Sequence, residues 1–209
     1  MPPRTRFAAP QDIRYVGPIG GRYSLAPADG PDAGKAEIYA CRAVSLSPTN
    51  AVLTVPVVAP AGRQIVLMLD HIGLIRGTVS RSAKADLHVA ITATAAEREK
   101  LAAKINWLKK HRHNQADNAR DAKRWRPKNP KGVFCLDDGS EHPCFIVDVS
   151  ASGAAISGGV VPAIGTPVRL GELPGVVVRH TETGFGIRFQ ATQQQSGLEA
   201  SIGARPTTP

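Results

Sequence analysis

Two stretches of the sequence are alike: CRAVSLSPTNAVL at residues 41–53 and CFIVDVSASGAAI at residues 144–156. Each begins with Cys, continues through mostly apolar residues that include one charged residue, passes through a turn that contains Ser and ends in a second apolar run. Short apolar runs separated by turn residues are typical of paired strands. The likeness between the two stretches indicates a unit that occurs twice in the chain.

The likeness continues on the C-terminal side of each stretch. GLIRGTVSR at 73–81 matches GELPGVVVR at 171–179 in character and spacing. Both are followed by a strand pattern, HVAI at 88–91 and GIRF at 186–189. Internal duplication of one β-rich unit explains these matches best. The sequence therefore predicts two small domains of the same kind.

A helix is predicted between the two units, over residues 94–112. Thr94 and Glu97 have the spacing of a capping box, and they open a run of good helix formers. Apolar residues recur at helical spacing on one face: Leu101, Ile105 and Leu108. The following residues up to 131 are polar and basic, which predicts a loop.

The positive charge of the chain lies in one segment. The net charge is +9, and residues 98–131 contain 12 Lys or Arg against 3 Asp or Glu, so the rest of the chain is neutral. A local positive field attracts polyanions such as nucleotides, nucleic acid or a membrane surface. A solvated linker helix is the alternative for the Lys-rich part of this segment.

The sequence predicts a cytoplasmic protein with no membrane insertion, no metal site and no cofactor. The N-terminal stretch lacks the apolar core of a secretory signal. The longest apolar stretch, 51–61, is interrupted by two prolines and is too short to span a bilayer. Three cysteines without CxxC spacing favour reduced, buried thiols over a disulfide framework or zinc site: Cys41, Cys135 and Cys144.

One set of polar residues precedes and enters the second unit. Arg120 and Arg124 form an RxxxR pair, and Asp148, Ser150 and Gly153 form a DxSxxG pattern after two predicted strands. Each pattern alone is common, because DxSxxG also occurs in ordinary turns. Their order and separation, ahead of a glycine-punctuated β region, are much more specific.

Through these residues and the closing GFGIRF strand, the segment 118–190 resembles the PilZ family of cyclic di-GMP receptors. The resemblance implies a six-stranded antiparallel β-barrel with a helix packed at its C-terminal end. We therefore expect a mainly β chain of two such small barrels joined by a helix and a basic loop. The expected segments are a degenerate PilZ-like barrel at 11–93, the connecting helix at 94–112, a PilZ domain at 113–192 and a mobile tail at 193–209.

The resemblance implies that cyclic di-GMP binds to Arg120, Arg124, Asp148, Ser150 and Gly153. Arginine can bind phosphate or the O6/N7 edge of guanine bidentately and can stack on a purine. A carboxylate can accept from the N1–H and N2–H₂ of guanine, a hydroxyl can bond a phosphate or base, and glycine admits close backbone approach. One bound ligand and a stacked pair both remain open.

Three neighbouring side chains are secondary candidates for the same ligand: Trp125, Arg126 and Arg179. Trp125 can stack on a base, but packing against the barrel as a surface anchor explains an aromatic residue here at least as well.

The first unit lacks the same pattern. Ser45 and Asn50 replace the Asp and the Gly, only Ser47 matches, and the two arginine positions fall on Ala9 and Ile13. We therefore expect this unit not to bind the nucleotide and to serve as a docking surface for a protein effector.

Catalysis is not expected, because neither GxxxxGK[ST] nor HExxH occurs and the histidines lack a partner pattern. Two other functions remain open: a structural adaptor without nucleotide binding, and non-specific nucleic-acid binding by the basic segment 98–131, without specific DNA recognition. The resemblance implies a role in bacterial motility, surface attachment or polysaccharide output.

Overall fold

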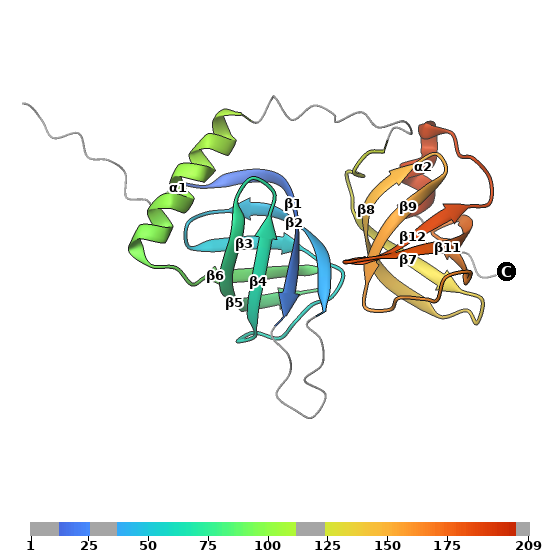
Figure 1. Ribbon diagram of the computed structural model, residues 1–209, viewed down its shortest axis with the longest axis horizontal. Coiled ribbons are helices and arrows are strands. Elements are labelled where there is room, and N and C mark those ends of the chain that lie inside the picture. The colour runs from blue at the N-terminus through green and yellow to red at the C-terminus, as the bar shows by residue number, and fades with distance from the viewer. Residues whose placement is uncertain (1–12, 26–36, 112–123, 204–209) are drawn as a thin grey trace, which may run out of the picture.

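The computed structural model describes residues 13–25, 37–111 and 124–203. These residues form two closed β-barrels that lie side by side, each followed by a helix (Figure 1). No helix within these ranges is long and apolar enough to cross a lipid bilayer.

The first barrel consists of six antiparallel strands and is followed by helix α1. Neighbouring strands follow the order β1-β2-β3-β6-β5-β4, and β4 closes the barrel by pairing with β1. The elements are β1 (Tyr15–Leu25), β2 (Ile38–Leu46), β3 (Asn50–Thr54), β4 (Gln64–Leu69), β5 (Gly73–Ala83), β6 (Asp86–Ile91) and α1 (Ala95–Lys110).

The second barrel repeats this plan. Its strand order, β7-β8-β9-β12-β11-β10, is that of the first barrel with each strand number raised by six. This confirms the prediction of a mainly β chain with two six-stranded antiparallel barrels. The elements are β7 (Lys131–Leu136), β8 (Glu141–Ser150), β9 (Gly153–Gly158), β10 (Pro167–Leu170), β11 (Leu173–Thr181), β12 (Gly184–Phe189) and α2 (Gln195–Gly203).

Each barrel has its own hydrophobic core, and matching residues fill the two cores. Tyr23 on β1 and Phe134 on β7 are both almost fully buried. Cys41 on β2 and Cys144 on β8 are buried free thiols, and burial raises the pKa of each to about 12. These two thiols therefore stay protonated at neutral pH and act as small apolar residues.

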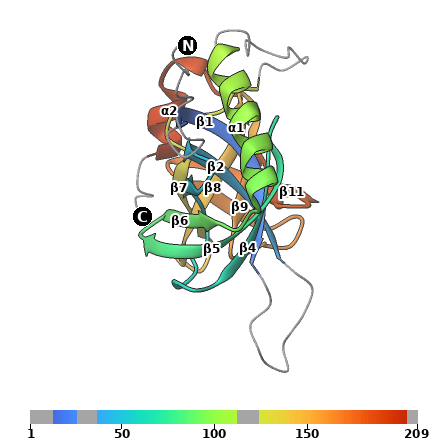
Figure 2. The ribbon, with the colours of Figure 1, turned by 90° about the vertical axis from the view of Figure 1, so that its left-hand side faces the viewer.

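Helix α1 confirms the helix predicted after the first unit. Its capping box is complete: the Thr94 hydroxyl accepts from the Glu97 amide at 3.3 Å, and the Glu97 carboxylate accepts from the Thr94 amide at 2.8 Å. The predicted apolar face is buried in the core of the first barrel through Leu101, Ile105 and Leu108. The helix lies on the side of the first barrel away from the second (Figures 1 and 2).

Helix α2 corrects the prediction of a mobile tail from residue 193. Residues 195–203 are helical, with a break at Ser196 and Gly197, and Leu198 and Ile202 are buried in the core of the second barrel. The amide of Glu172 also donates to the carbonyl of Ser201 at 3.0 Å. The polar composition of the tail obscured the helix, because its buried apolar residues are only two, four positions apart.

The two barrels contact each other mainly through β2. The backbone amide of Ala40 on β2 donates to the Ser157 hydroxyl on β9 at 3.0 Å. The guanidinium of Arg42 donates to the carbonyl oxygens of Pro127 and Lys128 at 2.8 and 3.1 Å. Arg42 is buried, so these bonds replace the water that its charge has lost.

Candidate ligand-binding site

The centre of the predicted site is an ion pair between Arg124 and Asp148. Nη1 of Arg124 donates to Oδ1 of Asp148 at 2.9 Å. The side chains are 42% and 31% exposed, so water competes for both charges and the pair contributes little to stability. An incoming ligand could therefore exchange with either partner at low cost.

A two-way backbone bridge holds this pair together. The amide of Trp125 donates to the carbonyl of Val149, and the amide of Val149 donates to the carbonyl of Trp125, both at 2.9 Å. A register shift in β8 between Ile146 and Asp148 lies just before the bridge. Residues 124–126, called the arginine segment below, are thus held against β8 beside Asp148.

Trp125 therefore has a structural role in this structure. Its side chain is half-buried and packs against the core of the second barrel. This agrees with the interpretation of Trp125 as an anchor.

Ser150 and Gly153 build the tight turn that joins β8 to β9. Ser150 is 1% exposed, and its hydroxyl donates to the Gly153 carbonyl at 3.2 Å. A Cβ at Gly153 would lie 2.2 Å from the carbonyl oxygen of Ile187 on β12. Both residues thus fix the turn that follows Asp148, and neither presents a free polar group in this conformation.

The remaining predicted residues lie apart from this pair. Arg126 points to the first barrel, where its Nη2 lies 3.2 Å from Oδ2 of Asp70. Arg179 is exposed on β11, and its Nε covers Gly186 on β12. Arg120 falls outside the described residues.

A cavity of about 360 Å³ lies between the barrels, next to the arginine segment. Arg126 and Val147 contribute from the second barrel, and Gly20, Arg42 and Asp70 contribute from the first. The pKa of Arg42 lies below its ordinary value, because burial disfavours its charge and Arg126 repels it. The cavity therefore has positive charge that an anion would stabilise.

Arg42 was not identified by sequence reasoning, although the repeat contains a signal for it. In the alignment of the two similar stretches, Arg42 occupies the position of Phe145. A charged residue at a position that is apolar in the other copy indicates a polar contact that the other copy does not make. The guanidinium carbon of Arg42 lies 5.9 Å from the centre of the Phe145 ring, a cation–π contact between the barrels.

Residues 118–203 match the family model of the PilZ domain. A comparison with curated protein sequences gave no significant match.

The matches among solved structures include PlzA of Borreliella burgdorferi in complex with c-di-GMP, at 14% identity, covering 88% of each chain with a TM-score of 0.29. The inhibitor of motility MotI/DgrA of Bacillus subtilis matches at 11% identity over 90% of this chain and 94% of that chain, with a TM-score of 0.28. The PilZ domain of CeSA from a cellulose-synthesizing bacterium matches at 16% identity over 47% of this chain and 98% of that chain, with a TM-score of 0.35.

The family match covers all of the second barrel, helix α2 and the arginine segment before them. The first barrel has the same strand order, so the two form a tandem. Residues 118–203 of this chain are a PilZ domain.

Proposed function

We propose that the chain is a cytoplasmic receptor for cyclic di-GMP, which binds at the second barrel through Arg120, Arg124, Asp148, Ser150 and Gly153. The observation that carries the proposal is the pairing of Arg124 with Asp148 at 2.9 Å within a PilZ domain. A cation and a carboxylate lie together at the surface, and the backbone bridge of Trp125 and Val149 keeps them there.

The two side chains would divide the recognition of the ligand. The Asp148 carboxylate would accept from the N1–H and N2–H₂ of one guanine, which no other base offers together. Arg124 would then turn from Asp148 to a phosphate or to the O6/N7 edge, where its planar fork can donate two bonds. Because the Arg124–Asp148 pair is solvated, the exchange loses little free energy.

Ser150 and Gly153 would act by holding the turn. Their hydrogen bond and the close approach of β12 keep the end of β8 rigid. A rigid carboxylate loses less conformational entropy on binding than one on a free loop.

Binding would be coupled to the orientation of the barrels through Arg126. This residue follows the arginine pair and forms an ion pair with Asp70 of the first barrel. A dianion at the arginine segment would compete with Asp70 for it. The ligand can change the orientation only by its difference in affinity for the two arrangements.

The cellular role would be that of an adaptor. A change in barrel orientation would expose or hide a surface for a protein effector on the first barrel, in the control of motility, attachment or polysaccharide output. We assign no residue to catalysis.

The test is calorimetric titration of the chain with cyclic di-GMP, GTP and cyclic di-AMP. We expect cyclic di-GMP alone to bind tightly. Arg124→Ala and Asp148→Asn should each weaken binding by about 2 kcal/mol, roughly thirtyfold, since each removes a charge-assisted hydrogen bond. Arg81→Ala, which removes an equal charge from the first barrel, should leave the affinity unchanged.

Equal binding of all three nucleotides, or unchanged affinity in both site variants, would contradict the proposal. Tight binding of DNA of any sequence that weakens steeply with salt would favour the nucleic-acid alternative. X-ray scattering of the saturated protein tests the coupling separately: an unchanged curve would remove the coupling and leave the binding site intact.

A further inference from the structure

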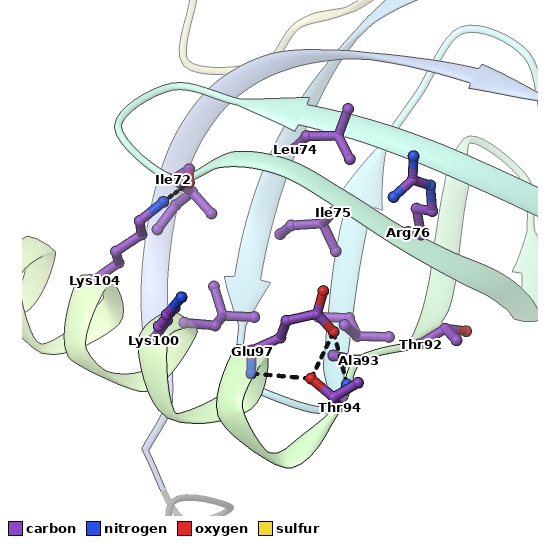
Figure 3. A pocket seen from close by; sticks show the side chains of 12 residues that line it. Ile72, Leu74, Ile75, Arg76, Thr92, Ala93, Thr94, Glu97, Lys100 and Lys104 are labelled. Carbon is purple, nitrogen blue, oxygen red and sulfur yellow. Dashed lines mark hydrogen bonds between the residues drawn. The ribbon is translucent and has the colours of Figure 1, made fainter.

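A second cavity lies far from the predicted nucleotide site, between α1 and the first barrel. Its volume is about 570 Å³, within the range of sites that bind small molecules. Helix α1 forms one side and strand β5 with the turn before it forms the other (Figure 3).

The walls of this cavity are mainly apolar. They include Ile72, Ile75, Ile91 and Leu101, which also belong to the barrel core. Leu74 is 52% exposed at the opening. The cavity is therefore continuous with apolar surface that water now covers, and an apolar ligand would displace that water.

Leu74 extends this apolar surface along the barrel. On the neighbouring strand β4, Met68 lies directly opposite Leu74 and is 39% exposed. The apolar part of a ligand that is too long for the cavity could continue over Leu74 and Met68.

Cations surround the apolar walls. Arg76 extends from β5, and Lys100 and Lys104 extend from α1 (Figure 3). Lys104 donates one hydrogen bond to the Ile72 carbonyl at 2.6 Å, which leaves its other donors free to bind a ligand. None of the ion pairs within residues 13–25, 37–111 and 124–203 involves Arg76 or Lys100.

The one carboxylate of the cavity is already used. Glu97 accepts from the amide and the hydroxyl of Thr94, at 2.8 and 2.9 Å, as part of the capping box. These bonds, with smaller contributions from Arg76 and Lys100, lower the pKa of Glu97. The cavity lining therefore contains three cations and one carboxylate, and that carboxylate already accepts hydrogen bonds at the start of α1. The net charge of the lining is positive.

We propose that this cavity binds a single-chain amphipathic anion, with its carboxylate or phosphate head between Arg76 and Lys100 and its alkyl chain along Ile72, Ile75 and Ile91. Apolar walls with a cationic rim match a ligand that has both parts. The lining contains no aromatic side chain on which a base could stack. The site lies on the first barrel and α1, outside the PilZ domain. The proposal therefore does not depend on nucleotide binding.

Calorimetric titration with decanoate, decyl phosphate and decanol, each below its aggregation limit, tests the head group. We expect saturable binding of one or both anions and at least tenfold weaker binding of decanol, because the alcohol lacks the charge. The preferred anion identifies the source as a free fatty acid or a phosphorylated lipid. Octanoate should bind about fifteenfold more weakly than decanoate, since it lacks two CH₂ groups and each buried CH₂ contributes roughly a fourfold gain in affinity.

Variants connect the binding to this cavity. Arg76→Gln and Lys100→Gln should each weaken decanoate binding about tenfold and leave decanol binding unchanged. Leu74→Glu should abolish decanoate binding, because it puts an anion at the opening. Lys109→Gln, an exposed position of the same helix outside the cavity, is the matched control for lost charge.

Three results would overturn the proposal. The first is binding of decanol as tight as that of decanoate, and the second is decanoate binding by the Arg76 and Lys100 variants equal to that of the control. The third is binding of an acidic peptide with apolar side chains at this cavity without binding of the alkyl anions. Arg124→Ala should keep full decanoate affinity, so failure of this proposal and failure of the nucleotide proposal can be told apart.

Discussion

At the scale of single residues, Gly153 shows how a close contact with a neighbouring strand's backbone restricts a position to glycine. The sequence predicts it as a ligand contact that admits close approach. In the structure the close approach is made by the carbonyl of Ile187, 2.2 Å from where a Cβ would lie. The backbone of β12 cannot move away without breaking its pairing with β9.

Gly153→Ala should therefore lower the free energy of unfolding by more than about 2 kcal/mol, as overpacking against backbone does. Gly203→Ala is the matched control, because no atom lies within 4 Å of its Cβ position. Chemical denaturation followed by circular dichroism measures both. Equal stability of the two variants would show that β9 and β12 can separate without loss.

The site residues could be predicted from the sequence only in part. The two patterns select Arg124 and Asp148, which lie 24 positions apart, and the structure adds that the two side chains contact each other. Their role in ligand binding stays a prediction. The internal hydrogen bond of Ser150 and the contact of Arg126 with Asp70 could not be predicted, because both depend on how strands and barrels come together. Arg42 could have been found by comparing the two copies position by position.

At the scale of elements, α1 was predicted well because its signals are local. A capping box and an apolar spacing of four and three residues are properties of one short segment. Helix α2 was missed because its stability comes from the barrel: Gly197 interrupts it, and its two buried apolar residues are Leu198 and Ile202. The resemblance supplied the six-stranded antiparallel barrel, but the strand order was not predicted, because it depends on pairing between distant segments.

The capping box of α1 is expected to matter for stability. Thr94→Ala removes the hydroxyl that accepts from the Glu97 amide and should lower the free energy of unfolding of the first barrel by about 1 kcal/mol. Thr92→Ala, two residues earlier and exposed, should cost less than half as much. Thermal unfolding of the two variants compares them. A larger loss in Thr92→Ala would assign the stability to the segment before the helix instead.

At the scale of the whole molecule, a buried cation, Arg42, takes part in the contact between the barrels. Arg42 donates to two carbonyl groups of the segment that enters the second barrel and lies over Phe145. Removal of its side chain leaves both carbonyl groups without this partner, and a buried polar group without a partner is costly.

Arg42→Ala should therefore release the barrels from each other while each stays folded. X-ray scattering should show a larger radius of gyration, and circular dichroism should show an unchanged strand signal. Arg81→Ala, an exposed position on the same barrel, should leave both unchanged. If the Arg42 variant keeps the original scattering curve, the remaining contacts between the barrels are sufficient.

The meeting of Arg42 and Phe145 also has a consequence for how the tandem holds together. These residues occupy corresponding places in the two copies, on β2 and β8, so two versions of one strand face each other. Twofold homodimers bring equivalent residues together in this manner at their axis. Here the two partners are barrels of one polypeptide. Their covalent connection keeps each barrel near the other at a local concentration of roughly millimolar. Such an association can be weak in itself and still persist, which leaves it within reach of a small molecule's binding energy.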